Sequence, residues 1–289
     1  MTTIQAALSG ALVGGLFAVM AVGLSLTWGM LKIINLAHFG LIILGAYLTF
    51  QITTSWGIDP LATLAITVPA LFVAGALLHW AFDRFGVVEF GSLLVSFGIL
   101  IIIVQTVTNL WSADFQRIGA DANPYATQSL SIGRFAFPMP TLLAFIFAVL
   151  IVGAAHLSLR RTFAGRALRA FAQDKEVAAA YGIDHRRLGM VLAGASAASA
   201  AIAGMLFALS RALTPTAPFE LIGVVFAVVI LGGIGQVIGT LAAGVLVGTI
   251  SSVVASVWSP SLSPFVVFSV IVLALLFRPQ GLFVRGGVR

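Results

Sequence analysis

Very few side chains in this sequence could carry out catalysis or bind a metal. The chain has no cysteine, and its four histidines lack the spacing that places two metal ligands on one helix face. A phosphate-binding loop of the type G-x-x-x-x-G-K-[ST] needs a Gly-Lys pair, but the two lysines, Lys32 and Lys175, follow Leu31 and Asp174. We therefore expect no catalytic residue, no metal site and no cofactor in this chain.

Polar and glycine residues interrupt two apolar stretches, 29–40 (GMLKIINLAHFG) and 232–239 (GGIGQVIG). At membrane depth such interruptions are tolerated where they face protein or a water-filled cavity, so they are candidates for a solute pathway. Asn35 and His38 are three residues apart and share one helix face, where they could hydrogen-bond a polar solute. A structural cap at a helix junction is an equally good interpretation. In the second stretch the pathway candidates are Gly232, Gly233 and Gln236.

Helix packing is the favoured alternative for the glycine-rich stretch. Small residues spaced four apart let two helices approach closely. The pairs Gly235 with Gly239 and Gly244 with Gly248 have this spacing.

The longest polar run outside the apolar segments covers residues 160–187 and has a helix-forming composition. Ala167, Ala170 and Phe171 fall on one helical face, with arginines on the other, which predicts a short amphipathic helix. Asp174 can cap a second short helix, which contains Glu176 in its first turn and stops at Gly182. Such a pair could rest on anionic lipid headgroups or dock into a groove on a partner protein.

Composition shows which elements must position these residues. With 60% hydrophobic and 8% charged residues, the chain differs sharply from a soluble domain, in which about 25% of residues are charged. The net charge of +6 does not indicate a nucleic-acid partner, because the basic residues lie between apolar runs and membrane topology explains them. The first basic residue is Lys32, so we expect the first apolar run to be retained rather than cleaved as a signal peptide.

The predicted fold is an all-α polytopic membrane protein with about eight or nine transmembrane helices, and with a short broken or glycine-interrupted helix in each half. A ninth segment, 220–235, has only sixteen residues and could either cross or re-enter. The eight firmer spans are 5–27, 38–54, 61–82, 91–111, 138–158, 188–210, 236–257 and 263–277.

Charge placement predicts the orientation, because lysine and arginine are retained on the cytoplasmic side. If 159–187 is cytoplasmic and 220–235 crosses, twelve of the fifteen basic residues lie inside and only Arg117, Arg134 and Arg211 lie outside. We expect the amino terminus outside and the carboxy terminus inside. The polar segment 112–137 would then form an irregular external cap. A re-entrant 220–235 would instead place Arg278, Arg285 and Arg289 outside.

Three stretches resemble the permeases of branched-chain amino acid ABC importers. The run GRALRAFAQDKEVAAAYGIDHRRL is similar to the family's cytoplasmic loop, GLSLTWGMLKIINLAHFGLIILGAYL (23–48) to its amino-terminal block, and the stretches 228–248 and 275–283 to its carboxy-terminal blocks. In the first block Phe39 stands before Gly40, where the family usually has His followed directly by Gly. This bulky residue is a further pathway candidate.

The resemblance implies a single transmembrane permease domain over 1–289 in a bacterial cytoplasmic (inner) membrane, moving a branched-chain or other hydrophobic amino acid, or else urea or a short amide. It implies four kinds of partner: two ATPase subunits that use ATP and Mg, a second related permease or a copy of this chain, an extracytoplasmic solute-binding protein, and membrane lipid. The implied ATPase-coupling residues are Gly165, Arg166, Arg169, Ala170, Asp174, Glu176, Ala178, Gly182 and Ile183.

The alternative function is an ion- or proton-coupled secondary carrier. Such a carrier is expected to have an acidic residue in the middle of a span, whereas all nine Asp and Glu residues fall in predicted loops or at span ends. A passive channel is a third interpretation, but it has no need for an ordered basic helix pair.

Overall fold

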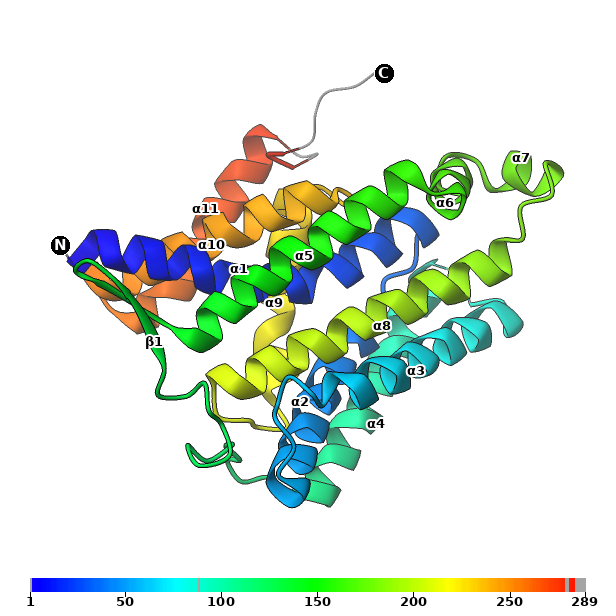
Figure 1. Ribbon diagram of the computed structural model, residues 1–289. Coiled ribbons are helices and arrows are strands. Elements are labelled where there is room, and N and C mark those ends of the chain that lie inside the picture. Colours follow the sequence, from blue (N-terminus) through cyan, green and yellow to red (C-terminus); the bar gives the residue numbers. More distant parts are fainter. Residues whose placement is uncertain (1, 88, 279–280, 284–289) are drawn as a thin grey trace.

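A computed structural model describes residues 2–87, 89–278 and 281–283, and its regular structure is almost entirely helical (Figure 1). A hairpin of β1 (Ser129–Ile132) and β2 (Phe135–Pro138) is the one sheet in these ranges. The helices are α1 (Thr2–Leu31), α2 (Ala37–Trp56), α3 (Leu64–Arg84), α4 (Glu89–Trp111), α5 (Met139–Arg161), α6 (Phe163–Gln173), α7 (Lys175–Ala180), α8 (His185–Ser210), α9 (Ala217–Gly232), α10 (Val237–Val257), the 3-10 turn Pro260–Leu262 and α11 (Ser263–Phe277).

Within the described residues, eight helices are long and apolar enough to cross a membrane. Each agrees with a predicted span to within about four residues at either end, so the all-α polytopic fold is confirmed. The predicted ninth segment is α9, but this helix begins and ends three residues earlier than predicted. Pro218 lies in its first turn, and Gly233, with φ of +89°, ends it.

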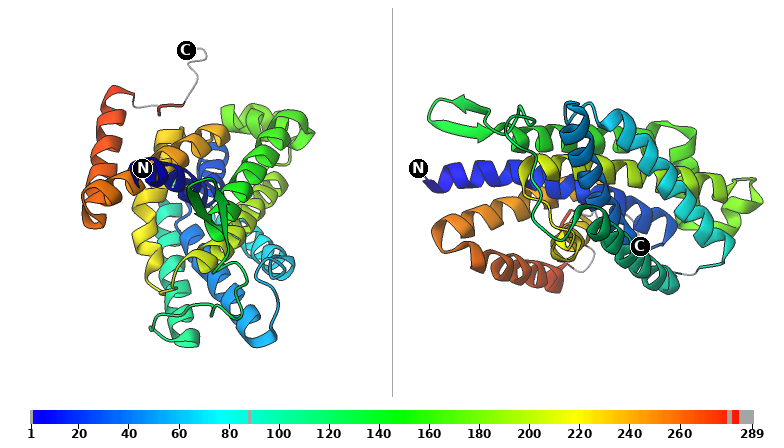
Figure 2. Two further views of the ribbon diagram at one scale, coloured as in Figure 1. Left: turned by 60° about the vertical axis from the view of Figure 1, so that its left-hand side comes forward. Right: turned by 90° about the horizontal axis from the view of Figure 1, so that it is seen from below.

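The molecule has two ends, which we call the hairpin end and the α6–α7 end after the elements that mark them (Figure 1). Leu213, just before α9, pairs with Gln116 in the segment that leads to the hairpin. Gly235, just after α9, approaches Gly29 in the last turn of α1, where the chain breaks before α2. The short helix α9 therefore begins beside the segment that leads to the hairpin and ends beside the last turn of α1. In the right view of Figure 2, α2 and α9 are seen nearly end-on while α1 lies in the plane.

The interior of the bundle is formed mainly by α1, α2 and α8, which are largely buried, whereas α3, α4, α5 and α11 are largely exposed. The close contact of α1 with α10 depends on glycine. A methyl group added at Gly244 would lie 2.7 Å from the Gly14 carbonyl oxygen and 2.9 Å from the Ala18 Cβ. Gly248 lies in the same way against Gly10 and Gly14. Helix packing, the favoured interpretation of these glycines, is confirmed.

The predicted irregular cap, segment 112–137, is in part wrong, since it contains β1 and most of β2. Gly133 has a φ of +62° and, with Arg134, makes the two-residue turn that right-handed strand twist requires. The rest of the segment is held to the α2–α3 connection, where the Tyr125 hydroxyl donates to Asp59 Oδ2 at 3.0 Å. Partial burial, together with the hydrogen bond and charge of Asp59, raises the pKa of Tyr125.

The predicted division of basic residues between the two sides of the membrane agrees with the hairpin end and the α6–α7 end of the molecule. Arg117, Arg134 and Arg211 belong to the segments at the hairpin end, whereas the arginines of the 160–187 run lie at the α6–α7 end. Arg285 and Arg289, which also supported the topology, lie outside the described residues.

Candidate functional site

The first break in the helices, residues 32–36, joins α1 to α2 and contains Asn35. Serine hydroxyls of α4 form hydrogen bonds with the backbone of this break. The Leu36 amide donates to Ser96 Oγ at 2.9 Å, and the Ser92 hydroxyl donates to the Ile34 carbonyl at 3.3 Å. Asn35 Oδ1 accepts from the Ala37 amide at 3.1 Å and so forms an Asx turn just before α2, whose N-cap residue is Leu36. The sequence interpretation did not anticipate these serines. Their one signal is a small hydroxyl at four-residue spacing inside an apolar span.

His38 lies in the first turn of α2 and is fully buried. Its Nε2 is 2.9 Å from the Met20 carbonyl oxygen on α1, and its Nδ1 is 3.4 Å from the Ser196 hydroxyl on α8. Because the Met20 carbonyl can only accept, Nε2 carries the proton and Nδ1 accepts from Ser196. The absence of a side chain at Gly23 provides the space for this ring. His38 thus ties together the three innermost helices.

Phe39 is also buried and stacks on Phe226 of α9, with ring centroids 6.0 Å apart and an interplanar angle of 21°. Trp28, near the end of α1, meets the same Phe226 at 5.8 Å. The three rings connect α1, α2 and α9 beside the first break. The structure therefore places the unusual Phe39 within a contact between helices.

The second break, residues 233–236, joins α9 to α10 and is held by α1. Ser25 Oγ accepts from the Gly235 amide at 3.1 Å and lies 3.2 Å from Thr240 Oγ1. Gly232 packs directly on Gly239, so the end of α9 and the start of α10 approach through their backbones. Both breaks therefore lie at the α6–α7 end, and each is fixed by hydroxyl groups of a neighbouring helix.

Gln236 differs from the other pathway candidates because it is exposed. It lines an open groove of about 560 Å³ between α5, α6 and α10, together with Met30, His156, Arg160 and Arg169. The structure brings Gln236 and Gly233 together in the second break, whereas Asn35, His38 and Phe39 belong to the first.

The amphipathic helix α6 forms as predicted, but its packed face is in part different. Thr162 caps it by accepting from the Gly165 amide at 3.0 Å, and Gly165 lies directly on Ser158 and Leu159 of α5. The buried residues are Gly165, Ala167 and Leu168, whereas Ala170 is exposed. The predicted face with Ala170 is wrong because the close approach at Gly165 turns α6 so that Leu168 enters the core.

The predicted second helix is α7, and its capping is confirmed. Asp174 Oδ1 accepts from the Glu176 and Val177 amides at 2.9 and 3.0 Å. Gly182, with φ of +78°, ends the helix in a Schellman motif, because its amide donates to Ala179 and the Ile183 amide donates to Ala178.

Apolar side chains are exposed on this otherwise polar pair of helices. Phe163 is 75% exposed, Val177 52% and Tyr181 85%. Arg166, Arg169 and Glu176 are exposed beside them, while Ala178 is buried. A surface that combines exposed aromatic and basic groups with buried small residues is typical of a protein contact.

On its inner side α6 packs on the start of α8, since the Phe171 ring stacks on His185 with centroids 6.0 Å apart and an interplanar angle of 3°. A second open groove, of about 470 Å³, lies here and is lined by Lys32, His79 and Asp83 among others. Helix α6 therefore stands between two grooves, one beside each break.

Comparison with known proteins assigns this arrangement to a family. Residues 6–275 match the family model described as branched-chain amino acid transport system, permease component. The chain is 26% identical to the high-affinity branched-chain amino acid transport system permease protein BraD of Pseudomonas aeruginosa, over 98% of this chain and 96% of that protein. It is also 26% identical to the permease protein LivH of the corresponding system of Escherichia coli K12, over the same shares. No solved structure matches the chain.

Proposed function

The chain belongs to the family of permease components of branched-chain amino acid transport systems, and from this premise we propose that it is the transmembrane subunit of an ATP-binding cassette importer. Its cargo is a branched-chain or other hydrophobic amino acid, with urea and short amides as further candidates. The observation that carries this proposal is the family match over residues 6–275, which includes both helix breaks and the α6–α7 pair.

ATP hydrolysis belongs to separate subunits in this proposal. Membership of a family of permease components agrees with the expectation that the chain itself is not an enzyme. The sequence has no Gly-Lys pair for a phosphate-binding loop. ATP and Mg are therefore used by two partner ATPases, and this chain binds no cofactor.

The α6–α7 pair is the proposed docking element for the ATPase. Phe163, Val177 and Tyr181 supply exposed apolar groups, and the Asp174 cap and the Gly182 turn hold α7 in place. Leu168 and the Phe171–His185 stack transmit movement of α6 to the bundle. The coupling residues are Gly165, Arg166, Arg169, Ala170, Asp174, Glu176, Ala178, Gly182 and Ile183.

The amino acid passes beside the two helix breaks in this proposal. Gln236 lines one open groove, and Gly232 and Gly233 shape the break that leads to it. Asn35 lines a small cavity with His79 below the other groove. His38 and Phe39 support the first break from within the bundle. A second related permease, or a copy of this chain, lines the rest of the solute pathway.

The α6–α7 end faces the cytoplasm and the hairpin end faces outward, in the inner membrane of a bacterium. Segment 112–137 then receives the extracytoplasmic solute-binding protein. Because the chain lacks cysteine, single cysteines report this topology directly. An impermeant maleimide added to intact cells should label S131C and not A179C, and the reverse result would refute the orientation.

Transport is tested with the permease, its partner permease, its ATPase and its binding protein in proteoliposomes. Labelled leucine should accumulate only with enclosed ATP and binding protein, and a protonophore should have no effect. Uptake that persists without ATP and collapses with the protonophore would favour the secondary carrier.

Docking is tested with Val177→Asp, which places a charge in the proposed ATPase contact. This variant should lose the ATPase on purification. Phe115→Ala, which removes an even more exposed apolar group at the hairpin end, is the control and should retain it. Equal ATPase recovery with V177D and F115A would overturn the docking assignment.

A further inference from the structure

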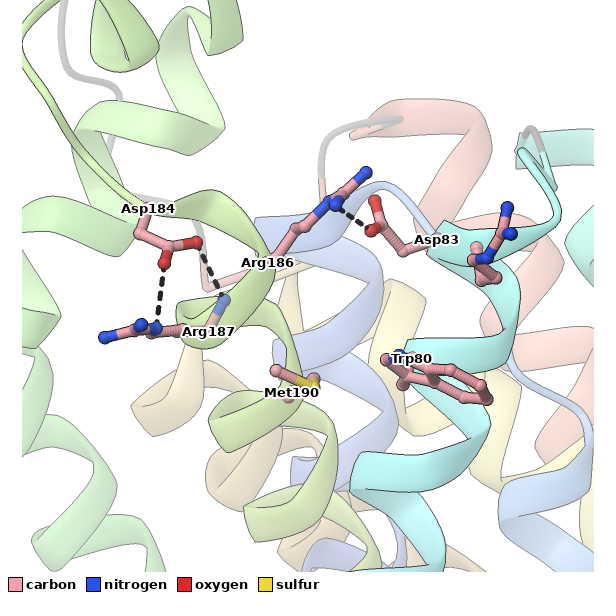
Figure 3. Close-up of a pocket in the computed structure, with 7 residues that line it drawn as sticks. Trp80, Asp83, Asp184, Arg186, Arg187 and Met190 are labelled. Atoms are coloured by element: carbon pink, nitrogen blue, oxygen red, sulfur yellow. Dashed lines mark hydrogen bonds and ion pairs between the residues drawn. The ribbon is translucent and has the colours of Figure 1, made fainter.

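The ends of α3 and α8 enclose a groove of about 260 Å³ that the transport proposal does not use (Figure 3). It opens at the α6–α7 end of the molecule, on the outer side of the α3–α8 pair. Toward the interior it is closed, since Gly189 leaves room for the His79 ring to pack against α8.

The rim of the groove is basic. Arg186 Nε binds Asp83 Oδ2 at 2.7 Å across the two helices, and Arg187 Nε binds Asp184 Oδ2 at 3.0 Å. Arg84 is exposed and makes no ion pair with any described residue. The rim therefore has three guanidinium groups and only two carboxylates. The rim keeps an excess positive charge, and N–H donors remain unused on each arginine.

The floor of the groove is apolar. Figure 3 shows Trp80 of α3 and Met190 of α8 side by side, one turn below the Arg186–Asp83 pair. From Trp80 the exposed stripe continues along α3 through Leu77 and Val73, which lie three and seven residues earlier on the same face. A basic rim thus stands directly above a continuous apolar surface on the outside of the bundle.

We propose that this groove binds an anionic phospholipid, with the phosphate at the basic rim beside Arg84 and one acyl chain along Val73, Leu77 and Trp80. Guanidinium groups match phosphate oxygens through paired N–H donors. Tryptophan favours the level of the headgroups, and basic pockets between transmembrane helices suit anionic headgroups. The inference requires only that this end of α3 and α8 lies at a membrane surface, and not that the chain transports an amino acid.

The apolar stripe argues for a lipid rather than a free anion. A soluble phosphate would need the rim alone and would leave Trp80 and Leu77 without a role. An acyl chain covers both residues, and the headgroup is then held at the level of Arg84.

The test titrates phosphatidylglycerol or phosphatidylcholine into the purified full-length chain and measures bound lipid by native mass spectrometry. The wild type should prefer phosphatidylglycerol. Arg84→Gln should weaken its binding by about fivefold, and R84Q combined with R187Q by about 25-fold, on the usual contribution of one basic residue at a lipid surface. The matched control is Arg166→Gln, which removes the same charge from the same end of the molecule but outside the groove.

Three results would overturn the proposal. One is a loss with R166Q as large as that with R84Q, which would make the preference a general surface-charge effect. The other is full competition by glycerol 1-phosphate at equal concentration, which would show that the rim binds phosphate without the acyl chain. Phosphatidylglycerol that still binds R84Q and R187Q as it binds the wild type counts against the groove in the same way.

Discussion

The glycine contact between α1 and α10 provides the sharpest test of what holds this bundle together. Replacing Gly244 by alanine places a Cβ 2.7 Å from the Gly14 carbonyl oxygen and 2.9 Å from the Ala18 Cβ. Ordinary contacts of this kind begin near 3.4 Å, so the two helices must separate by several tenths of an ångström. Backbone and Ala18 are the obstacles, and neither can rotate away.

The expected cost follows from overpacking. Forcing one extra carbon into a packed contact costs about 1–3 kcal/mol, and separation of the helices also weakens the dispersion contacts along the pair. Gly153→Ala is the matched control, because a Cβ at this helical position on α5 meets nothing within 4 Å. It should be neutral or slightly stabilising, by less than about 1 kcal/mol, since alanine favours helix over glycine.

The assay is unfolding of the purified chain in mixed micelles with a rising fraction of sodium dodecyl sulfate, followed by circular dichroism. G244A should unfold at a lower fraction of the denaturing detergent than the wild type, and G153A should not. If the free energies of unfolding of G244A and G153A agree within about 0.5 kcal/mol, the α1–α10 contact is not limited by backbone approach.

Three further predictions concern other parts of the chain. Ser96→Ala removes the buried acceptor of the Leu36 amide and should cost about 1–3 kcal/mol in the same unfolding assay; a stability equal to wild type would mean that another group satisfies this amide. Leu168→Ala empties the contact of α6 with the core, so the assembled transporter should hydrolyse ATP with reduced uptake per ATP, whereas an unchanged ratio would remove Leu168 from the coupling path. The raised pKa of Tyr125 means that the folded chain favours the protonated phenol. The stability that this residue contributes is therefore complete below the ordinary tyrosine value of about 10 and declines as pH rises through the raised value. Tyr125→Phe, which cannot donate to Asp59, should abolish that decline in a pH titration of unfolding, and an unaltered alkaline decline would contradict the assignment.

Much of the fold could be predicted because it depends on local properties of the chain. Apolar length alone locates the eight long helices, and the caps at Asp174 and Gly182 depend on residues within a few positions. The glycine pairs around Gly244 were also interpretable, since their spacing has one common physical use. The excess of arginine in 160–187 separates the two ends.

The remainder depends on which elements meet in space. Ser96 and Ser25 are unremarkable in sequence, and their role at the breaks follows only from α4 and α1 lying beside them. Ala170 has the right periodicity for the packed face of α6, but the contact of Gly165 with α5 sets the rotation. Phe39 occupies an unusual position in sequence, but nothing there indicates its partner Phe226, which lies in another helix.

The partnership of α1 with α10 also has a consequence for biosynthesis. Gly10, Gly14 and Gly29 of α1 meet Gly248, Gly244 and Gly235, which lie more than 200 residues later in the chain. At a synthesis rate of about 5–20 residues per second, roughly 10–50 seconds separate the emergence of the two segments from the ribosome. During that interval Gly10, Gly14 and Gly29 of the first helix lack the contacts that α10 and the segment before it provide. A chain whose translation stops before residue 237 lacks α10 and never covers Gly10 and Gly14.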